Sequence, residues 1–158
     1  MSGSDLSGYT SYEIADDSYF ETVKGYWPDG KIRIKCVMLG SIIYEFRIGK
    51  EYRYDKMGRL NYAVASDEHF DFTFEQVLEY LLEEEKVPLK PGKTWVGDYS
   101  LESVNRLNPH EDNRSWEIIW NMRDPAYGVF GKQIVLVLDG KTGEVVSRTE
   151  QEAPIMKE

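Results

Sequence analysis

The sequence predicts an α+β fold in which one main helix packs on an antiparallel sheet of about seven to nine strands, strongly bent or in two sections. Alternating apolar and polar residues recur along most of the chain, and glycine-containing turns separate these runs. One interval, residues 73–86, has helical spacing instead. Because 158 residues suit one domain of ordinary size, we expect residues 1–158 to form a single domain.

The first eighteen residues carry no strand pattern. They are polar and rich in Ser, Gly and Asp, which is typical of a frayed terminus. We therefore expect residues 1–18 to be flexible, with at most a short turn, and ordered structure to start near Tyr19.

Residues 19–66 have the pattern of a β-meander. In one strand the apolar face carries Ile32, Ile34 and Cys36, and the other face carries Lys31, Arg33 and Lys35. Two pieces of this subregion also repeat each other at an offset of 28 residues, because Tyr26–Ile32 and Tyr54–Leu60 share one order of residue types. That order is an aromatic residue, three turn residues, glycine, a base and an aliphatic residue.

This repeated pattern resembles the variant of the MORN repeat found in many bacterial proteins, over about residues 20–65. The resemblance implies that each unit is a hairpin. Since two units are fewer than a solenoid needs to bury its face, we expect another element to cover this sheet.

The covering element is the predicted helix near 73–86. Thr73 and Gln76 have the spacing of a capping box at its start. The apolar positions recur every three or four residues, as one buried stripe requires, at Phe74, Val77, Leu78, Leu81 and Leu82. Pro88 and Pro91 end the pattern.

Extended structure returns after residue 93. Residues 95–104 have a largely extended pattern, although 101–107 also fit one or two helical turns. The run 115–122 predicts a strand with Trp116, Ile118 and Trp120 on one face, and 132–138 with 144–149 predict a hairpin joined by 139–143.

Residues 73–149 resemble the closing half of PepSY-like and other cystatin-like bacterial domains. The resemblance rests on the Trp-x-Ile strand and on the final hairpin with its Asp-Gly-Lys-Thr-Gly turn. It implies a helix packed across a curved antiparallel sheet over residues 70–149. It implies no fixed catalytic residues.

The charge is negative and unevenly distributed. The net charge is −9 and the isoelectric point about 4.8; residues 1–23 carry −5, residues 24–59 carry +5 and residues 60–158 carry −9. A negative chain opposes broad electrostatic attachment to nucleic acid or to anionic lipid. The basic strand face at 31–35 lies near tyrosines, as in some nucleic-acid binders, but protection of an edge strand explains its lysines more simply. We therefore expect a basic protein partner and no nucleic acid or membrane.

The sequence contains no convincing catalytic or metal-binding motif. Both Gly-Lys-Thr tripeptides lack the glycine that a phosphate-binding loop needs five residues earlier. His69 and His110 lie in acidic clusters without zinc or calcium-loop spacing, and Cys36 falls in an apolar strand, where an inert thiol is expected. We expect no enzymatic activity, no metal and no cofactor.

Several features suit a cytoplasmic protein. One cysteine allows no internal disulfide, and no apolar stretch is long enough for a transmembrane helix or a signal peptide. A leader removed before residue 1 remains an open alternative.

Two segments are candidates for partner binding. Glu75, Glu79 and Glu83 share the polar face of the predicted helix, where they form either a docking strip for a cationic partner or an ordinary solvated face. The predicted loop 123–130 carries Arg123, Tyr127 and Phe130, residue types that dominate interface energies. The alternative for the two loop aromatics is burial against the sheet.

These observations favour a non-enzymatic protein-binding module. Small acidic α+β proteins with such hairpins resemble the immunity proteins that neutralise basic bacterial toxins, so an acidic inhibitor of this type is the leading interpretation. The alternative is a cystatin-like or PepSY-like small-ligand domain, with an apolar pocket lined by Trp95, Trp116 or Trp120.

Overall fold

The computed structural model describes residues 8–40, 46–93, 95–124, 126 and 130–153. Its described residues divide into two compact units, unit 1 up to Glu68 and unit 2 from His69. This boundary lies between the two subregions expected from the sequence, 19–66 and 70–149. That the two units together form a single domain stays a prediction.

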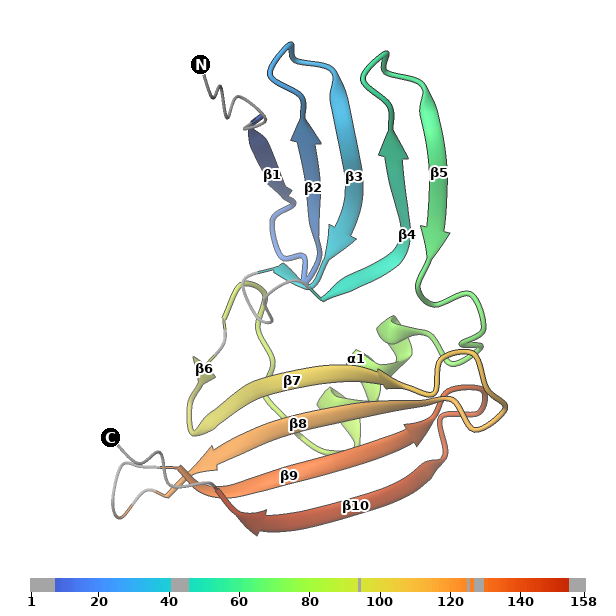
Figure 1. Ribbon diagram of the computed structural model, residues 1–158. Coiled ribbons are helices and arrows are strands. Elements are labelled where there is room, and N and C mark those ends of the chain that lie inside the picture. Colours follow the sequence, from blue (N-terminus) through green and yellow to red (C-terminus); the bar gives the residue numbers. More distant parts are fainter. Residues whose placement is uncertain (1–7, 41–45, 94, 125, 127–129, 154–158) are drawn as a thin grey trace, which may run out of the picture. The chain divides into compact units, whose positions relative to one another are not determined.

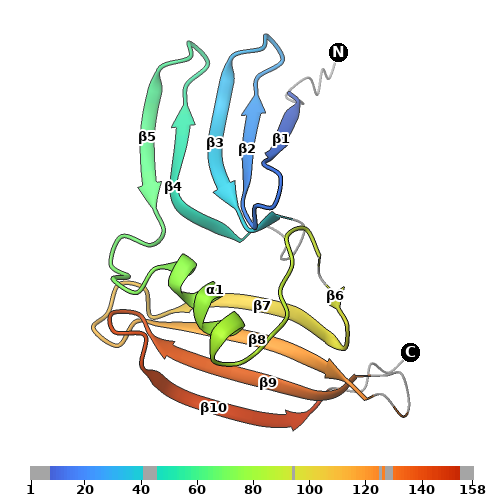
Figure 2. The same ribbon diagram turned by 180° about the vertical axis from the view of Figure 1, so that it is seen from behind.

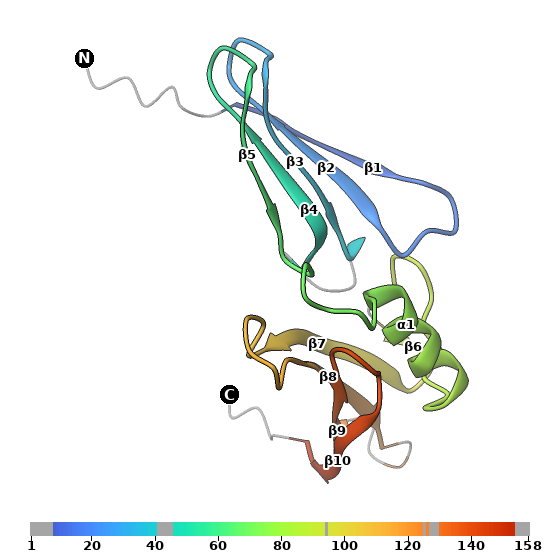
Figure 3. The ribbon, with the colours of Figure 1, turned by 90° about the vertical axis from the view of Figure 1, so that its right-hand side faces the viewer.

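Unit 1 is a five-stranded antiparallel sheet with its strands in chain order (Figure 1). The strands are β1 (Thr10–Ile14), β2 (Glu21–Tyr26), β3 (Ile32–Met38), β4 (Arg47–Tyr54) and β5 (Leu60–Ala65). Strands β2 to β5 follow one another in this sheet, within the interval 19–66 for which a meander was expected. Figure 3 shows this sheet almost edge-on, as a single layer.

Strand β1 corrects, for residues 10–14, the expectation that the first eighteen residues form at most a short turn. It pairs with β2 along all five residues, and Tyr12 lies opposite Val23. Two contacts outside the backbone ladder hold it in place: the rings of Tyr9 and Tyr26 stack with centroids 4.6 Å apart, and Lys24 donates to Glu13 at 2.7 Å. Composition failed to reveal this strand because its stabilising partners lie on β2.

The two segments that repeat at an offset of 28 residues in the sequence also form turns of the same geometry. Gly30 and Gly58 both have positive φ, 84° and 81°, a region that glycine adopts without strain. Each turn is closed by the same two backbone hydrogen bonds, from Trp27 N–H to Lys31 O and Gly30 N–H to Trp27 O, and from Asp55 N–H to Arg59 O and Gly58 N–H to Asp55 O. Unit 1 is therefore built around two equivalent hairpins, β2–β3 and β4–β5.

Unit 2 places one helix on a second antiparallel sheet. The helix α1 spans Phe74–Glu83, and the strands are β6 (Trp95–Val96), β7 (Tyr99–Leu107), β8 (Ser115–Arg123), β9 (Phe130–Asp139) and β10 (Val145–Glu152). The strand order is β10-β9-β8-β7-β6, so β6 is a two-residue edge beside four long strands. Figure 2 shows α1 lying across one face of this sheet.

The expectation of one bent sheet of seven to nine strands is wrong, because the strands form two separate sheets. The α+β class itself agrees with the structure. Every strand pairs with a sequence neighbour, but β5 and β6 are separated by α1 and its proline-containing exit. Residues 101–107 continue strand β7 and form no helical turn.

The helix begins as the sequence predicts. Thr73 Oγ1 accepts from the Gln76 N–H, and Gln76 Oε1 accepts from the Thr73 N–H, which completes the capping box. The helix ends at Glu83, three residues before the predicted end near residue 86, and Lys86 adopts φ 55°, a left-handed conformation typical of the residues that follow a helix. Among the described residues, no helix has the length and apolar character needed to cross a membrane.

The core of unit 2 lies between α1 and the sheet. On β8, Trp116, Ile118 and Trp120 are fully buried, on one face as predicted. Their register partners on β9 are also fully buried, namely Leu138, Leu136 and Ile134. From the helix side, Phe74 meets the Trp116 ring with centroids 5.6 Å apart.

The short segment before α1 is fixed by hydrogen bonds from distant parts of unit 2. The Phe72 N–H donates to Gly140 O at 3.0 Å, and Phe72 O accepts from Trp116 Nε1 at 2.9 Å. Arg114 donates to His69 O at 3.0 Å. The start of the helix is therefore held by β8 and by the β9–β10 turn.

Candidate interaction surfaces

The polar face of α1 presents its carboxylates to solvent. Glu75, Glu79 and Glu83 are all exposed, opposite the stripe that buries Phe74 and Leu81. Among the described residues, none of these three carboxylates takes part in an ion pair. The last helical turn contains no base. We call Glu75, Glu79 and Glu83 the acid strip.

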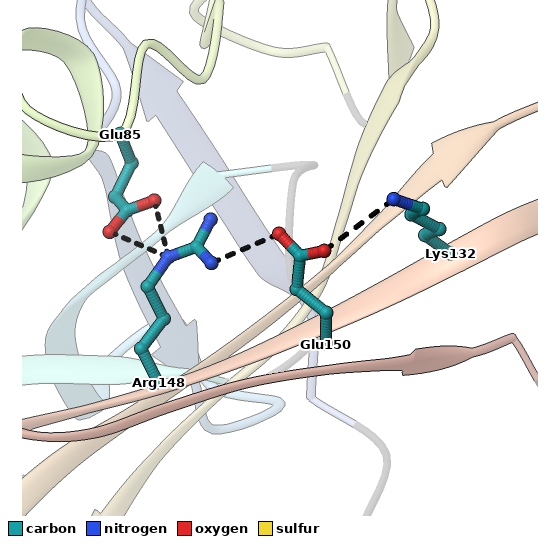
Figure 4. A network of polar contacts seen from close by, with 4 residues as sticks. All are labelled: Glu85, Lys132, Arg148 and Glu150. Atoms are coloured by element: carbon teal, nitrogen blue, oxygen red, sulfur yellow. Dashed lines mark hydrogen bonds and ion pairs between the residues drawn. The ribbon is translucent and has the colours of Figure 1, made fainter.

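Glu85, just beyond the helix, has a different environment from the acid strip. Its carboxylate accepts from Arg148 Nε, with both oxygens within 3.1 Å, and its side chain is 10% exposed. Arg148 also bonds Glu150 at 3.0 Å, and Glu150 lies 3.5 Å from Lys132 (Figure 4). The hydrogen bonds that Arg148 donates to Glu150 and Glu85 raise the pKa of Arg148, and the hydrogen bond from Arg148 lowers the pKa of Glu150. Glu85 is therefore neutralised within unit 2.

The structure describes only part of the predicted loop 123–130. Arg123 is exposed at the end of β8, and its N–H donates to Asp98 O at 2.7 Å. Its backbone pairs with Phe130 at the start of β9. Tyr127 and the side chain of Phe130 lie outside the described residues, so their part in a binding surface stays a prediction.

Exposed apolar side chains on unit 1 were missed in the sequence. Of the large apolar residues that the structure describes as exposed, Val145 and Val146 belong to unit 2 and the others to unit 1. Those of unit 1 are Tyr9, Tyr12, Ile14, Met57, Leu60, Tyr62 and Val64. They lie in separate places, because β1 and β5 are opposite edges of the sheet, and on β5 three of them, Leu60, Tyr62 and Val64, share one strand. The sequence signal for the exposed residues of β5 was the uncharged run Leu60–Ala65. It did not predict their exposure, because its alternation is equally typical of a half-buried strand.

The unit 1 sheet also contains a buried carboxylate between two guanidinium groups. Glu51, only 7% exposed, accepts a hydrogen bond from Arg47 and another from Arg53 Nε at 2.5 Å. The hydrogen bond to Glu51 raises the pKa of Arg53. Pairing with an arginine on both sides offsets the desolvation cost of the buried Glu51 carboxylate. These three charged residues of β4 therefore pair with one another.

The basic residues of β3 do not protect an edge, contrary to the sequence interpretation, because β3 is the central strand of its sheet. Lys31 pairs with Asp29 at 2.8 Å. The Arg33 guanidinium lies 5.5 Å from the centre of the Trp27 ring, and Lys56 of the second turn lies 5.8 Å from it. These cations therefore stabilise the paired turns by ion pairing and cation–π attraction.

Cys36 lies in the middle of the unit 1 sheet, opposite Val23, and is 3% exposed. Burial raises the pKa of its thiol, so at a given pH less thiolate is present than in the unfolded chain. We expect a thiol reagent such as DTNB at pH 8 to react roughly a hundredfold more slowly with the native protein than with urea-unfolded protein. Equal rates would show that unit 1 opens readily.

The two histidines come close together in unit 2. The rings of His69 and His110 meet edge to face with centroids 6.3 Å apart. Within the described part of the chain, however, no group of three potential metal-ligating side chains gathers. The pair therefore supplies too few ligands for a closed protein metal site.

Polar side chains are hydrogen-bonded from strand to strand on the face of the unit 2 sheet opposite the Trp120–Ile134 pair. Gln151 on β10 donates to Gln133 on β9 at 2.7 Å. Gln133 and Asn121 both donate to Glu102 on β7, each at 2.7 Å. Asn121 and Gln133 are buried, so this ladder satisfies polar groups that would otherwise be costly. Its role is structural.

Two of the three tryptophans proposed to line a ligand pocket are core residues. Trp116 is 0% exposed and Trp120 is 1% exposed, so neither ring borders a space that admits water. The Trp116 ring packs on Phe70, with centroids 4.4 Å apart. The side chain of Trp95 lies outside the described residues.

Comparisons with known proteins identify no relative of this chain. No protein family, no curated protein and no solved structure matches it. Its function must therefore be inferred from its own surfaces.

Proposed function

We propose that this protein is a non-enzymatic protein-binding module, an acidic inhibitor of the immunity type that neutralises a basic bacterial toxin. The observation that carries the proposal is the acid strip. Its three carboxylates are exposed and have no ion-pair partner among the described residues, whereas neighbouring Glu85 is paired with Arg148. The Glu85 charge is compensated within unit 2 by Arg148. The charges of the acid strip are not compensated by an ion pair among the described residues, so they are available to a cationic partner.

The distribution of charge supports a cationic partner. Residues 1–68 contain nine bases and eleven acids, a net −2, whereas residues 69–158 contain ten bases and seventeen acids, a net −7. Most of the negative charge therefore belongs to the segment that carries the acid strip. Such a field accelerates encounter with a positively charged surface and disfavours anionic partners.

Aromatic anchors are needed in addition to charge, because a few buried rings and arginines supply most of the energy of an interface. Arg123, Tyr127 and Phe130 are the residues we propose for this role. Arg123 is exposed, as the role requires. A toxin bound at both surfaces would be steered by the acid strip and held by the anchors.

The test is to replace the acid strip and measure association with a basic toxin domain that binds the natural protein. The triple variant Glu75→Gln, Glu79→Gln, Glu83→Gln should associate about tenfold more slowly at low salt, with a flatter salt dependence. Because like charges at i,i+4 repel, the same variant should unfold at a slightly higher urea concentration than the natural protein.

A second triple variant controls for net charge alone. Glu111, Glu144 and Glu152 are exposed carboxylates of unit 2 that lie elsewhere in the unit, and changing all three to glutamine removes the same charge. The control should associate within about twofold of the natural rate. Equal slowing by both triples would remove the acid strip from the interface, and failure of the natural protein to restore growth of toxin-expressing cells would contradict the inhibitor function.

A further inference from the structure

We propose that the outer edge of β5 is a self-association interface, through which two copies of this chain pair antiparallel to join their unit 1 sheets. This inference does not rest on the proposed toxin inhibition. It follows from the chemistry of the edge, the direction of its backbone groups and the internal repeat of unit 1.

Strand β5 is an edge with little of the usual protection, since its pairing with β4 has one irregularity, near the start of β5, between the pairs Arg53–Tyr62 and Tyr54–Leu60. Its sequence, Leu60–Ala65, contains no charge and no proline. Leu60, Tyr62 and Val64 are 56%, 49% and 47% exposed. Edge strands that avoid pairing with other chains use charged residues, proline, bulges or short length.

The other sheet edges have such protection. Strand β1 carries Glu13 and has five residues, and β6 has two residues. Strand β10 carries Arg148, Glu150 and Glu152. Only β5, among the edges that the structure describes, combines length, exposed apolar side chains and the absence of charge.

Backbone hydrogen bonding shows which groups of β5 are available. The Ser66 N–H donates to Gly49 O at 3.2 Å, beside the register pair Lys50–Ala65. In an antiparallel ladder this makes Val64 and Tyr62 the residues whose backbone groups point to β4. Ala63 and Ala65 then direct theirs outward, where no strand among the described residues pairs with them. A row of donors and acceptors is therefore open.

The internal repeat shows that this kind of edge accepts a strand. At the 28-residue offset β5 corresponds to β3, and the outer edge of β3 does pair antiparallel with β4, for example at Lys35–Tyr52. The residue that corresponds to Lys35 is Ala63. Because the repeat stops after two hairpins without a polar cap, β5 leaves an unfilled strand position.

A second copy fits this position because β5 is complementary to itself. In the two-fold register centred on Ala63, Tyr62 of each copy lies opposite Val64 of the other, an aromatic and β-branched pair that stabilises antiparallel strands. The flanking positions 59 and 67, an arginine and an aspartate, also face each other, so that no like charges meet. The joined sheet would contain ten strands.

The first test is a charge on the edge. Analytical ultracentrifugation of the full chain should show a species of twice 18.4 kDa that dissociates on dilution. Val64→Lys should weaken this dimer about tenfold or more, because a lysine would replace the valine in both cross-strand Tyr62–Val64 pairs. Val146→Lys, a matched change at an exposed valine of edge strand β10, should leave the dimer unchanged.

The second test is a cross-link that depends on register. The outward pair at the two-fold centre would bring the two Ala63 Cα atoms to about 5.5 Å, within disulfide range. Ala63→Cys should therefore form an interchain disulfide on mild oxidation, and Ala65→Cys should not, because its own copy lies about 13 Å away along the strand. The buried Cys36 does not compete.

The outcomes separate self-association from other uses of the edge. A chain that stays monomeric at all concentrations, with no Ala63→Cys cross-link, overturns the proposal. Cross-linking of Ala65→Cys but not Ala63→Cys overturns the register. If the chain is monomeric but Val64→Lys abolishes binding to a different polypeptide, the edge receives a foreign strand and the homodimer is wrong.

Discussion

Trp116→Ala is expected to destabilise unit 2 by about 3–5 kcal/mol, a large loss for a single substitution. The Trp116 side chain is fully buried, with Phe70 and Phe74 against its ring and Arg106 5.2 Å from the ring centre. Its Nε1–H also donates to Phe72 O. Truncation would therefore leave a cavity and an unsatisfied carbonyl at the start of α1.

Urea unfolding followed by circular dichroism measures this loss. Trp116→Phe separates the two causes, because it keeps an aromatic ring but removes the hydrogen bond; we expect it to cost about 1–3 kcal/mol. Val146→Ala, at an exposed position of the same sheet, should fall within about 0.5 kcal/mol of the natural protein. A Trp116→Ala variant as stable as Val146→Ala would contradict the described core.

Gly143→Ala is expected to cost about 2–4 kcal/mol for two separable reasons. Gly143 closes the β9–β10 turn with φ 75°, where alanine is strained. A Cβ at this position would also lie 2.4 Å from the ring of Phe72. The turn could accept alanine only if the Phe72 ring, in the segment that precedes α1, moved away from Gly143.

Gly92→Ala is the matched control for backbone strain. Gly92 has a similar φ of 67°, but no atom lies within 4 Å of its Cβ position. We therefore expect Gly92→Ala to cost about 1 kcal/mol, and the difference between the two variants reports the Phe72 contact. Equal losses of unfolding free energy would show that Phe72 moves aside without cost.

The candidate surfaces were only partly predictable. The exposure of Glu75, Glu79 and Glu83 follows from helical periodicity, because burying Phe74 and Leu81 turns the glutamates outward. The neutralisation of Glu85 did not follow, since Arg148 lies 63 positions away along the chain. The exposure of β5 was equally hidden, because a strand's place in its sheet depends on which strands pair with it.

The sequence by itself determined the local elements of this protein: the strands of the meander, the two equivalent turns, the capped helix and the final hairpin. Each depends on residues a few positions apart, such as Thr73 with Gln76 or Gly30 with Trp27. Tertiary structure alone decided that the strands form two sheets, that 10–14 add a strand, and that β5 is left at an edge. These outcomes depend on hydrogen bonds and packing between residues far apart in the chain, which periodicity does not encode.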